Sequence, residues 1–67
     1  MRIVVNGQPM EVSDGASVEQ LLGELNVRRQ FTAVALNREV TPRSGYATTI
    51  LREGDRVEIV HPMAGGR

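Results

Sequence analysis

The residues that could do chemistry lie at the end of the chain, in Met63-Ala64-Gly65-Gly66-Arg67. Glycine has no Cβ, so a tail with two glycines can enter a narrow channel in another protein. A C-terminal carboxylate is ionised at neutral pH, and its oxygen can attack the α-phosphorus of ATP to form an acyl-adenylate. The tail therefore predicts a carboxyl end that another protein activates. The competing interpretation is a frayed terminus with no role.

The rest of the chain offers little for catalysis. Among its 67 residues there is no cysteine and no lysine, which excludes thiolate nucleophiles, thiolate-bound clusters, disulfides and Schiff bases. His61 is the single histidine and cannot supply a zinc ligand set alone. We expect no catalytic residue, no metal site and no cofactor bound by this chain, so any activation depends on a partner.

Charge and hydropathy exclude further classes of partner. Eight arginines balance eight acidic residues, and this neutral mixture argues against a nucleic-acid footprint or an anionic membrane surface. No apolar run approaches the roughly 20 residues of a membrane span, and residues 1–7 lack a signal-peptide pattern. We therefore expect a cytoplasmic protein without a nucleic-acid or membrane partner.

The elements that position the tail begin with a hairpin. Residues 2–6 and 8–12 alternate as two strands around Asn6-Gly7, a pair typical of a type I′ turn. Pro9 cannot donate a ladder hydrogen bond, which predicts that the second strand lies at a sheet edge.

A helix and further strands follow the hairpin. Ser17 and Gln20 have capping-box spacing, and apolar residues at i, i+3, i+4 and i+7 form one stripe that ends before Asn26. We predict strands at 33–37, 48–51 and 56–60, the last in a central position. The core should be aliphatic, with Tyr46 covering a sheet edge. These elements predict an α+β fold in a single domain, residues 1–67, with residues 62–67 as a flexible tail.

Five segments carry a resemblance to a known family: IVVNG (3–7), the helix at 17–25, VALNREVTPR (34–43), LREGDRVEI (51–59) and Gly65-Gly66. Their order and spacing resemble the ThiS family of thiamine-biosynthesis sulfur carriers over essentially the whole chain. The resemblance implies a ubiquitin-like β-grasp fold, a mixed sheet with one main helix packed across one face. It also implies that the first and last strands lie side by side in parallel.

The resemblance further implies a function. Gly66 would be adenylated by an E1-like, ThiF-type enzyme that uses ATP and Mg, and would then receive sulfur from a cysteine desulfurase pathway as a thiocarboxylate. A ThiG-type thiazole synthase would accept that sulfur. Gly65 and Ala64 would thread the tail into these partners, and the chain itself would be a protein cosubstrate rather than an enzyme.

The chain departs from the family's pattern at Arg67, which follows the second glycine. As written, the carboxylate belongs to the wrong residue, so Arg67 is either an extension that a peptidase removes or a remnant of preparation. We expect it to block adenylation.

Partner docking is predicted at the sheet face without a helix and beside the tail. By strand parity and position the candidates are Val4, Ala35, Val60, His61 and Met63. Other functions stay open at this point: a MoaD-like carrier for another acceptor, a small β-grasp protein-binding module, or a modifier attached to lysines.

Overall fold

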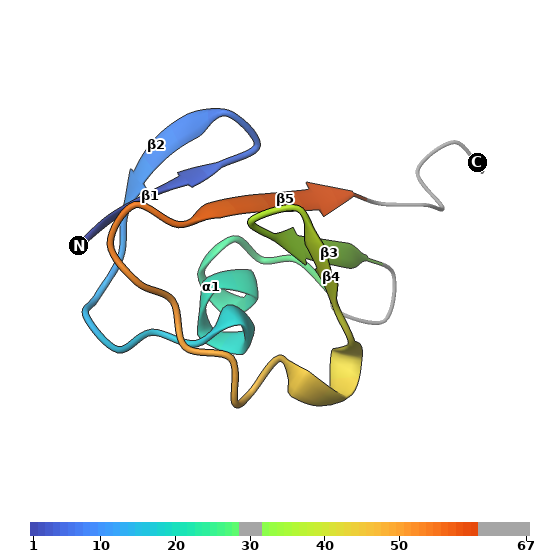
Figure 1. Ribbon diagram of the computed structural model, residues 1–67. Coiled ribbons are helices and arrows are strands. Elements are labelled where there is room, and N and C mark those ends of the chain that lie inside the picture. Colours follow the sequence, from blue (N-terminus) through green and yellow to red (C-terminus); the bar gives the residue numbers. More distant parts are fainter. Residues whose placement is uncertain (29–31, 61–67) are drawn as a thin grey trace.

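Five strands, one α-helix and a short 3-10 helix make up the described part of the chain, which in the computed structural model comprises residues 1–28 and 32–60 (Figure 1). In chain order the elements are β1 (Arg2–Val5), β2 (Gln8–Glu11), α1 (Val18–Glu24), β3 (Ala33–Leu36), β4 (Glu39–Thr41), the 3-10 helix η2 (Arg43–Gly45) and β5 (Arg56–Val60).

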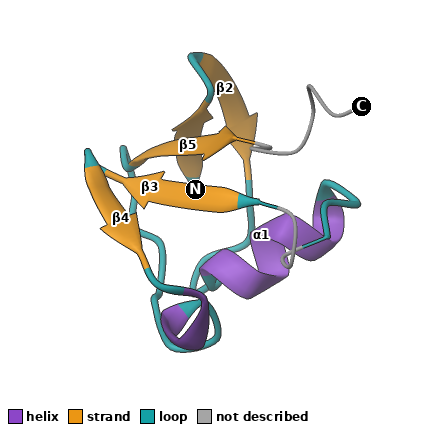
Figure 2. Cartoon of the chain, turned by 90° about the vertical axis from the view of Figure 1, so that its right-hand side faces the viewer, coloured by secondary structure: helices purple, strands orange, loops and turns teal. Residues whose placement is uncertain are grey.

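The strands form one mixed sheet with β5 at its centre. The strand order is β2-β1-β5-β3-β4, and β5 is parallel to β1 and antiparallel to β3. Helix α1 packs on one face of this sheet (Figure 2). The predicted α+β class, the parallel pairing of the first and last strands and the central place of the final strand are confirmed. This arrangement is the β-grasp fold.

The first hairpin forms as the sequence predicts. Asn6 and Gly7 have φ angles of 50° and 82°, and the register pairs Val5 with Gln8 across a two-residue turn. Both positive φ values match a type I′ turn, whose twist suits the flanking strands. β2, which contains Pro9, is an edge strand as expected.

A second hairpin was not predicted. β4 pairs antiparallel with β3 through a turn at Asn37 and Arg38, which have φ angles of 51° and 72°. Arginine is uncommon in the left-handed region, so Asn37-Arg38 gives a much weaker turn signal than Asn6-Gly7. β4 is also only three residues long, too short for a clear alternation.

The prediction of a strand at residues 48–51 is wrong. The segment makes only an isolated bridge between Ile50 and Ser17. Its backbone is held by the start of the helix, since Val18 N–H donates to the Thr49 carbonyl at 2.9 Å and Leu51 N–H donates to the Ala16 carbonyl at 2.8 Å. The neighbour of this segment is therefore the chain entering α1 and not a strand of the sheet.

The helix begins at the predicted capping box. The Ser17 hydroxyl accepts from Gln20 N–H at 3.1 Å, and the Gln20 side chain accepts from Ser17 N–H at 2.9 Å. Val18, Leu21 and Leu22 are buried on the face toward the sheet. The chain turns away at Asn26, whose φ of 58° is not helical.

Within residues 1–28 and 32–60 the core contains one aromatic residue, Tyr46, which corrects the prediction of an aliphatic core. Tyr46 is only 1% exposed and does not cover a sheet edge. It directly follows η2, and its carbonyl accepts from Glu19 N–H at 3.1 Å, which ties this segment to the first turn of α1. The parity of a strand cannot place a residue in such a loop, so its burial was missed.

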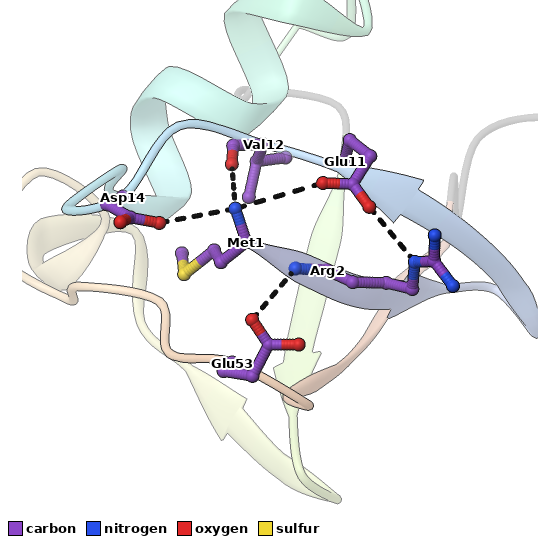
Figure 3. A network of polar contacts seen from close by, with 6 residues as sticks. All are labelled: Met1, Arg2, Glu11, Val12, Asp14 and Glu53. Atoms are coloured by element: carbon purple, nitrogen blue, oxygen red, sulfur yellow. Dashed lines mark hydrogen bonds and ion pairs between the residues drawn. The ribbon is translucent and has the colours of Figure 1, made fainter.

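The amino end of β1 is held by the polar network shown in Figure 3. The Met1 ammonium donates to the Val12 carbonyl at 2.8 Å and lies 3.2 Å from an Asp14 carboxylate oxygen. Arg2 Nε donates to Glu11 Oε2 at 3.0 Å across the β1–β2 pair. These carboxylates are largely exposed, so each ion pair contributes little, but the hydrogen bonds fix the register of the hairpin.

Replacing Tyr46 should test its place in the core. We expect Tyr46→Leu to lower the free energy of unfolding by about 2 kcal/mol, because a smaller side chain leaves a cavity among packed neighbours. Val40→Ala is the matched control, since Val40 is 77% exposed, and should change stability by less than about 0.5 kcal/mol. Urea unfolding followed by circular dichroism measures both. Equal losses would contradict the buried position of Tyr46.

Candidate functional site

The candidate site is the carboxyl end of β5 together with the tail that follows it. β5 ends at Val60, and the chain then continues beyond the described residues. The predicted tail and several predicted site residues lie outside the described part: His61, Met63, Ala64, Gly65, Gly66 and Arg67. The roles assigned to these residues stay predictions.

The body of the site is set by the alternation of β5. Val57 and Ile59 are 1% and 6% exposed and belong to the core between the sheet and α1. Arg56, Glu58 and Val60 point to the opposite side and are exposed. The side chains on one side of β5 therefore belong to the core, and those on the other side are accessible to a partner.

Strand register brings the predicted docking residues onto that open face. Val4 lies opposite Arg56 in the β1–β5 pair, Ala35 lies opposite Glu58, and Ala33 lies opposite Val60. Residues that are directly opposite in a sheet share a face. We call this the outer face, defined by Val4, Ala33, Ala35, Val40, Arg56, Glu58 and Val60. It includes all three docking candidates that the structure describes, although their role in docking stays a prediction.

Val40 belongs to the outer face and was missed from the sequence. It pairs with Ala35 across the second hairpin and is 77% exposed, while Val60 is 56% exposed. Large exposed aliphatic side chains on one face commonly mark interaction surfaces. The parity of Val40 with Ala35 would have identified it, but only once β4 was known to form.

The outer face combines apolar and charged side chains. Val60 at the end of β5 is paired with Ala33 of β3, and these two residues lie next to the Ala35–Val40 pair on β3 and β4. Glu58 lies beside Ala35, and Arg56 lies between this group and Val4 on β1. The face thus offers a partner an apolar patch flanked by one acidic and one basic side chain, Glu58 and Arg56.

A hollow in the described residues lies on the helix side. It is open to solvent and is lined by Ser13, Asp14, Gly15, Ala16, Gln20, Gly23 and Glu24. Within residues 1–28 and 32–60, no group of three histidine, cysteine or acidic side chains is placed to hold a metal ion. No helix in those ranges is long and apolar enough to cross a membrane.

Comparisons with known proteins identify relatives of the whole chain. A model of the ThiS family matches residues 3–66. The chain is 35% identical over 66 residues to the sulfur carrier protein ThiS of Escherichia coli (strain K12), which covers 98% of this chain and 100% of that protein. The crystal structure of the thiamine biosynthesis protein ThiS from Geobacter metallireducens has a TM-score of 0.86 and 36% identity, and covers 98% of this chain and all of that one.

Similarity also extends to a larger protein. The chain is 42% identical over 66 residues to a thiazole synthase of Paramagnetospirillum magneticum, covering 98% of this chain but 20% of that protein. The chain thus spans about a fifth of the length of this relative. The match over residues 3–66, the shared fold and the full-length similarity to ThiS proteins agree with one another, and the chain therefore belongs to the ThiS family.

Proposed function

We propose that the chain is a sulfur carrier whose C-terminal glycine, Gly66, is adenylated and then converted to a thiocarboxylate for thiazole formation in thiamine biosynthesis. The observation that carries the proposal is the family match, which runs through Gly65 to Gly66. A solved ThiS structure with the same β-grasp body supports it. In this proposal the chain is a cosubstrate, and the catalysts are its partners.

The proposed chemistry has two steps. A Gly66 carboxylate oxygen attacks the α-phosphorus of ATP, and the bond from that phosphorus to the pyrophosphate oxygen breaks. Sulfur from a cysteine desulfurase pathway, released from its persulfide as sulfide by a thiol reductant, then attacks the acyl carbon, and AMP leaves with its oxygen. The E1-like, ThiF-type partner binds ATP and Mg and provides the groups that stabilise charge in both steps.

A ThiG-type thiazole synthase is the proposed acceptor. Two thiazole synthases, from Paramagnetospirillum magneticum and Magnetococcus marinus, include a region 42% and 36% identical to this chain. A carrier and the enzyme that it serves have reason to share one polypeptide, because a short tether raises their effective concentration. This observation favours a thiazole synthase over a molybdopterin-type acceptor.

The activating enzyme is the proposed partner of the outer face. Val60 is both the last described residue of β5 and one of the exposed aliphatic residues of this face. A protein that binds the outer face therefore lies next to Val60, after which the chain continues toward Gly66. Docking there and threading of the tail, by way of Met63, Ala64 and Gly65, become parts of one binding event.

Removal of Arg67 should allow adenylation of the C-terminal carboxylate. The form ending at Gly66 should release pyrophosphate when incubated with a ThiF-type enzyme and ATP, whereas the 67-residue form should not, because its carboxylate is on a bulky, charged residue. A 66-residue form with a terminal carboxamide is the matched control, since it keeps the backbone but lacks the nucleophile. Equal turnover of the two carboxylate forms would refute the role of Gly66.

Sulfur transfer should be visible in the intact mass. After incubation with the activating enzyme, ATP and a desulfurase system, the chain ending at Gly66 should gain the difference between one sulfur and one oxygen atom. Addition of a ThiG-type synthase and its other substrates should return it to the starting mass. A β-grasp binding module would show no change, and a lysine-linked modifier would appear as an adduct of a second protein.

Docking on the outer face can be tested with a matched pair of substitutions. Val60→Glu should raise the KM for the carrier in pyrophosphate release about tenfold, because it places a charge in an apolar contact. Ile50→Glu is the control: Ile50 is 49% exposed, close to the 56% of Val60, but it lies beside the start of α1. Similar KM values for the two variants would argue against this docking face.

A further inference from the structure

β5 extends further along the sheet than its parallel neighbour. The pairing of β1 with β5 covers only Val4 with Arg56 and Val5 with Val57, whereas β5 continues to Val60. β1 stops because the chain turns away at Asn6 and Gly7. Toward its end, β5 therefore has only β3 as a neighbouring strand.

The side chain of Asn6 takes the place that the next residue of β1 would occupy. Ile59 N–H donates to Asn6 Oδ1 at 2.8 Å, and Asn6 Nδ2 donates to the Ile59 carbonyl at 3.2 Å. The Asn6 backbone N–H donates to the Val57 carbonyl at 2.9 Å. A primary amide has the same donor and acceptor types as a peptide group, so the parallel pairing extends to Ile59.

A second asparagine pairs with the other end of β5, where its side chain supplies an acceptor only. Asn37 N–H donates to the Arg56 carbonyl at 2.8 Å, and Arg56 N–H donates to Asn37 Oδ1 at 2.9 Å. Asn37 Nδ2 also donates to Asp55 Oδ1 at 3.1 Å. Asn6 and Asn37 have nearly the same φ, 50° and 51°, and each is the first residue of a tight turn. β5 is thus bracketed by two side-chain amides.

From this geometry we propose that Asn6 is a positioning residue, whose amide fixes the point at which the chain leaves the sheet on its way to Gly66. The inference rests on the proposed function, in which the Gly66 carboxylate must reach an active site while the body is docked. Ile59 is the residue next to the end of β5. Without the Asn6 amide, the backbone groups of Ile59 lose their partner on the β1 side.

The expected consequence concerns rate more than affinity. If the end of β5 is paired on one side only, more chain lies between the docked body and Gly66, and this lowers the effective concentration of the carboxylate at the reacting phosphorus. Val60 keeps its pairing with Ala33 of β3, so we expect the outer face and docking on it to be preserved. Loss of the Asn37 amide frees the start of β5 instead and leaves the point of departure in place.

The test compares Asn6→Gly with Asn37→Gly. Glycine accepts the positive φ at both positions, so each variant loses one side-chain amide from the same backbone conformation. Pyrophosphate release with a ThiF-type enzyme is measured against carrier concentration, in the 66- and 67-residue forms. For the active form we expect kcat to fall about tenfold in Asn6→Gly with KM within about twofold, and neither parameter to change by more than about twofold in Asn37→Gly.

Two further measurements keep the test decisive. Amide hydrogen exchange of Ile59 should become faster in Asn6→Gly and stay slow in Asn37→Gly. Asn6→Asp, which keeps an acceptor for Ile59 N–H but sets an oxygen against its carbonyl, should also lower kcat, and replaces Asn6→Gly if that variant does not fold. Equal kcat in both glycine variants, or faster Ile59 exchange without loss of kcat, overturns the proposal.

Failure of the proposed function gives a different result. In that case the unmodified chain releases no pyrophosphate in either form, and no variant can differ from it in rate. The exchange measurement then decides the inference alone: Ile59 protection that is lost only in Asn6→Gly supports the assignment of Asn6, and unchanged protection in that variant overturns it.

Discussion

The central position of β5 is the constraint on which the rest of the structure depends. β5 pairs with β1 on one side and β3 on the other, and its inward residues Val57 and Ile59 lie in the core. A slip of one residue in either pairing would turn Arg56 and Glu58 into the core and Val57 into solvent, at a large cost in desolvation. The register is therefore strongly specified, and with it the exposure of Val60 and the direction in which the chain continues.

Tight turns next to a central strand create a local problem that two asparagines solve. A chain that must leave the sheet after a few residues takes its backbone hydrogen bonds with it, and N–H and C=O groups on the neighbouring strand then lose their partners. Asparagine tolerates the positive φ of such a turn, and its amide also replaces the missing peptide group. The Asn6 amide pairs with both backbone groups of Ile59, and Asn37 Oδ1 accepts from Arg56 N–H. One residue type thus ends one strand while extending the pairing of another.

The sequence predicts what depends on local periodicity and misses what depends on tertiary context. The apolar stripe of α1, the Asn6-Gly7 turn and the alternation of β5 are local patterns, and each prediction made from them is confirmed. The same alternation placed Val4, Ala35 and Val60 on the outer face. The exposure of Val40 was not predicted because its strand follows an Asn37-Arg38 turn, which is a weak turn signal. The burial of Tyr46 was not predicted because it depends on a loop whose backbone bonds to the first turn of α1. The sequence indicates Asn6 only as a turn residue, because the partner of its side-chain amide, Ile59, is 53 residues away.

The division of β5 into two faces also explains how a domain this small can carry out the proposed function. Domains of this length have little stability to spare, so residues that form the core cannot also be adjusted to suit a partner. Here the core uses Val57 and Ile59, while Glu58 and Val60 contribute nothing to it and are free to suit whatever protein docks. A carrier that must visit an activating enzyme and an acceptor needs one surface and one tail that both partners can use. Because β5 ends at Val60, the pairing that stabilises the fold also sets the point at which the chain leaves the sheet relative to the outer face.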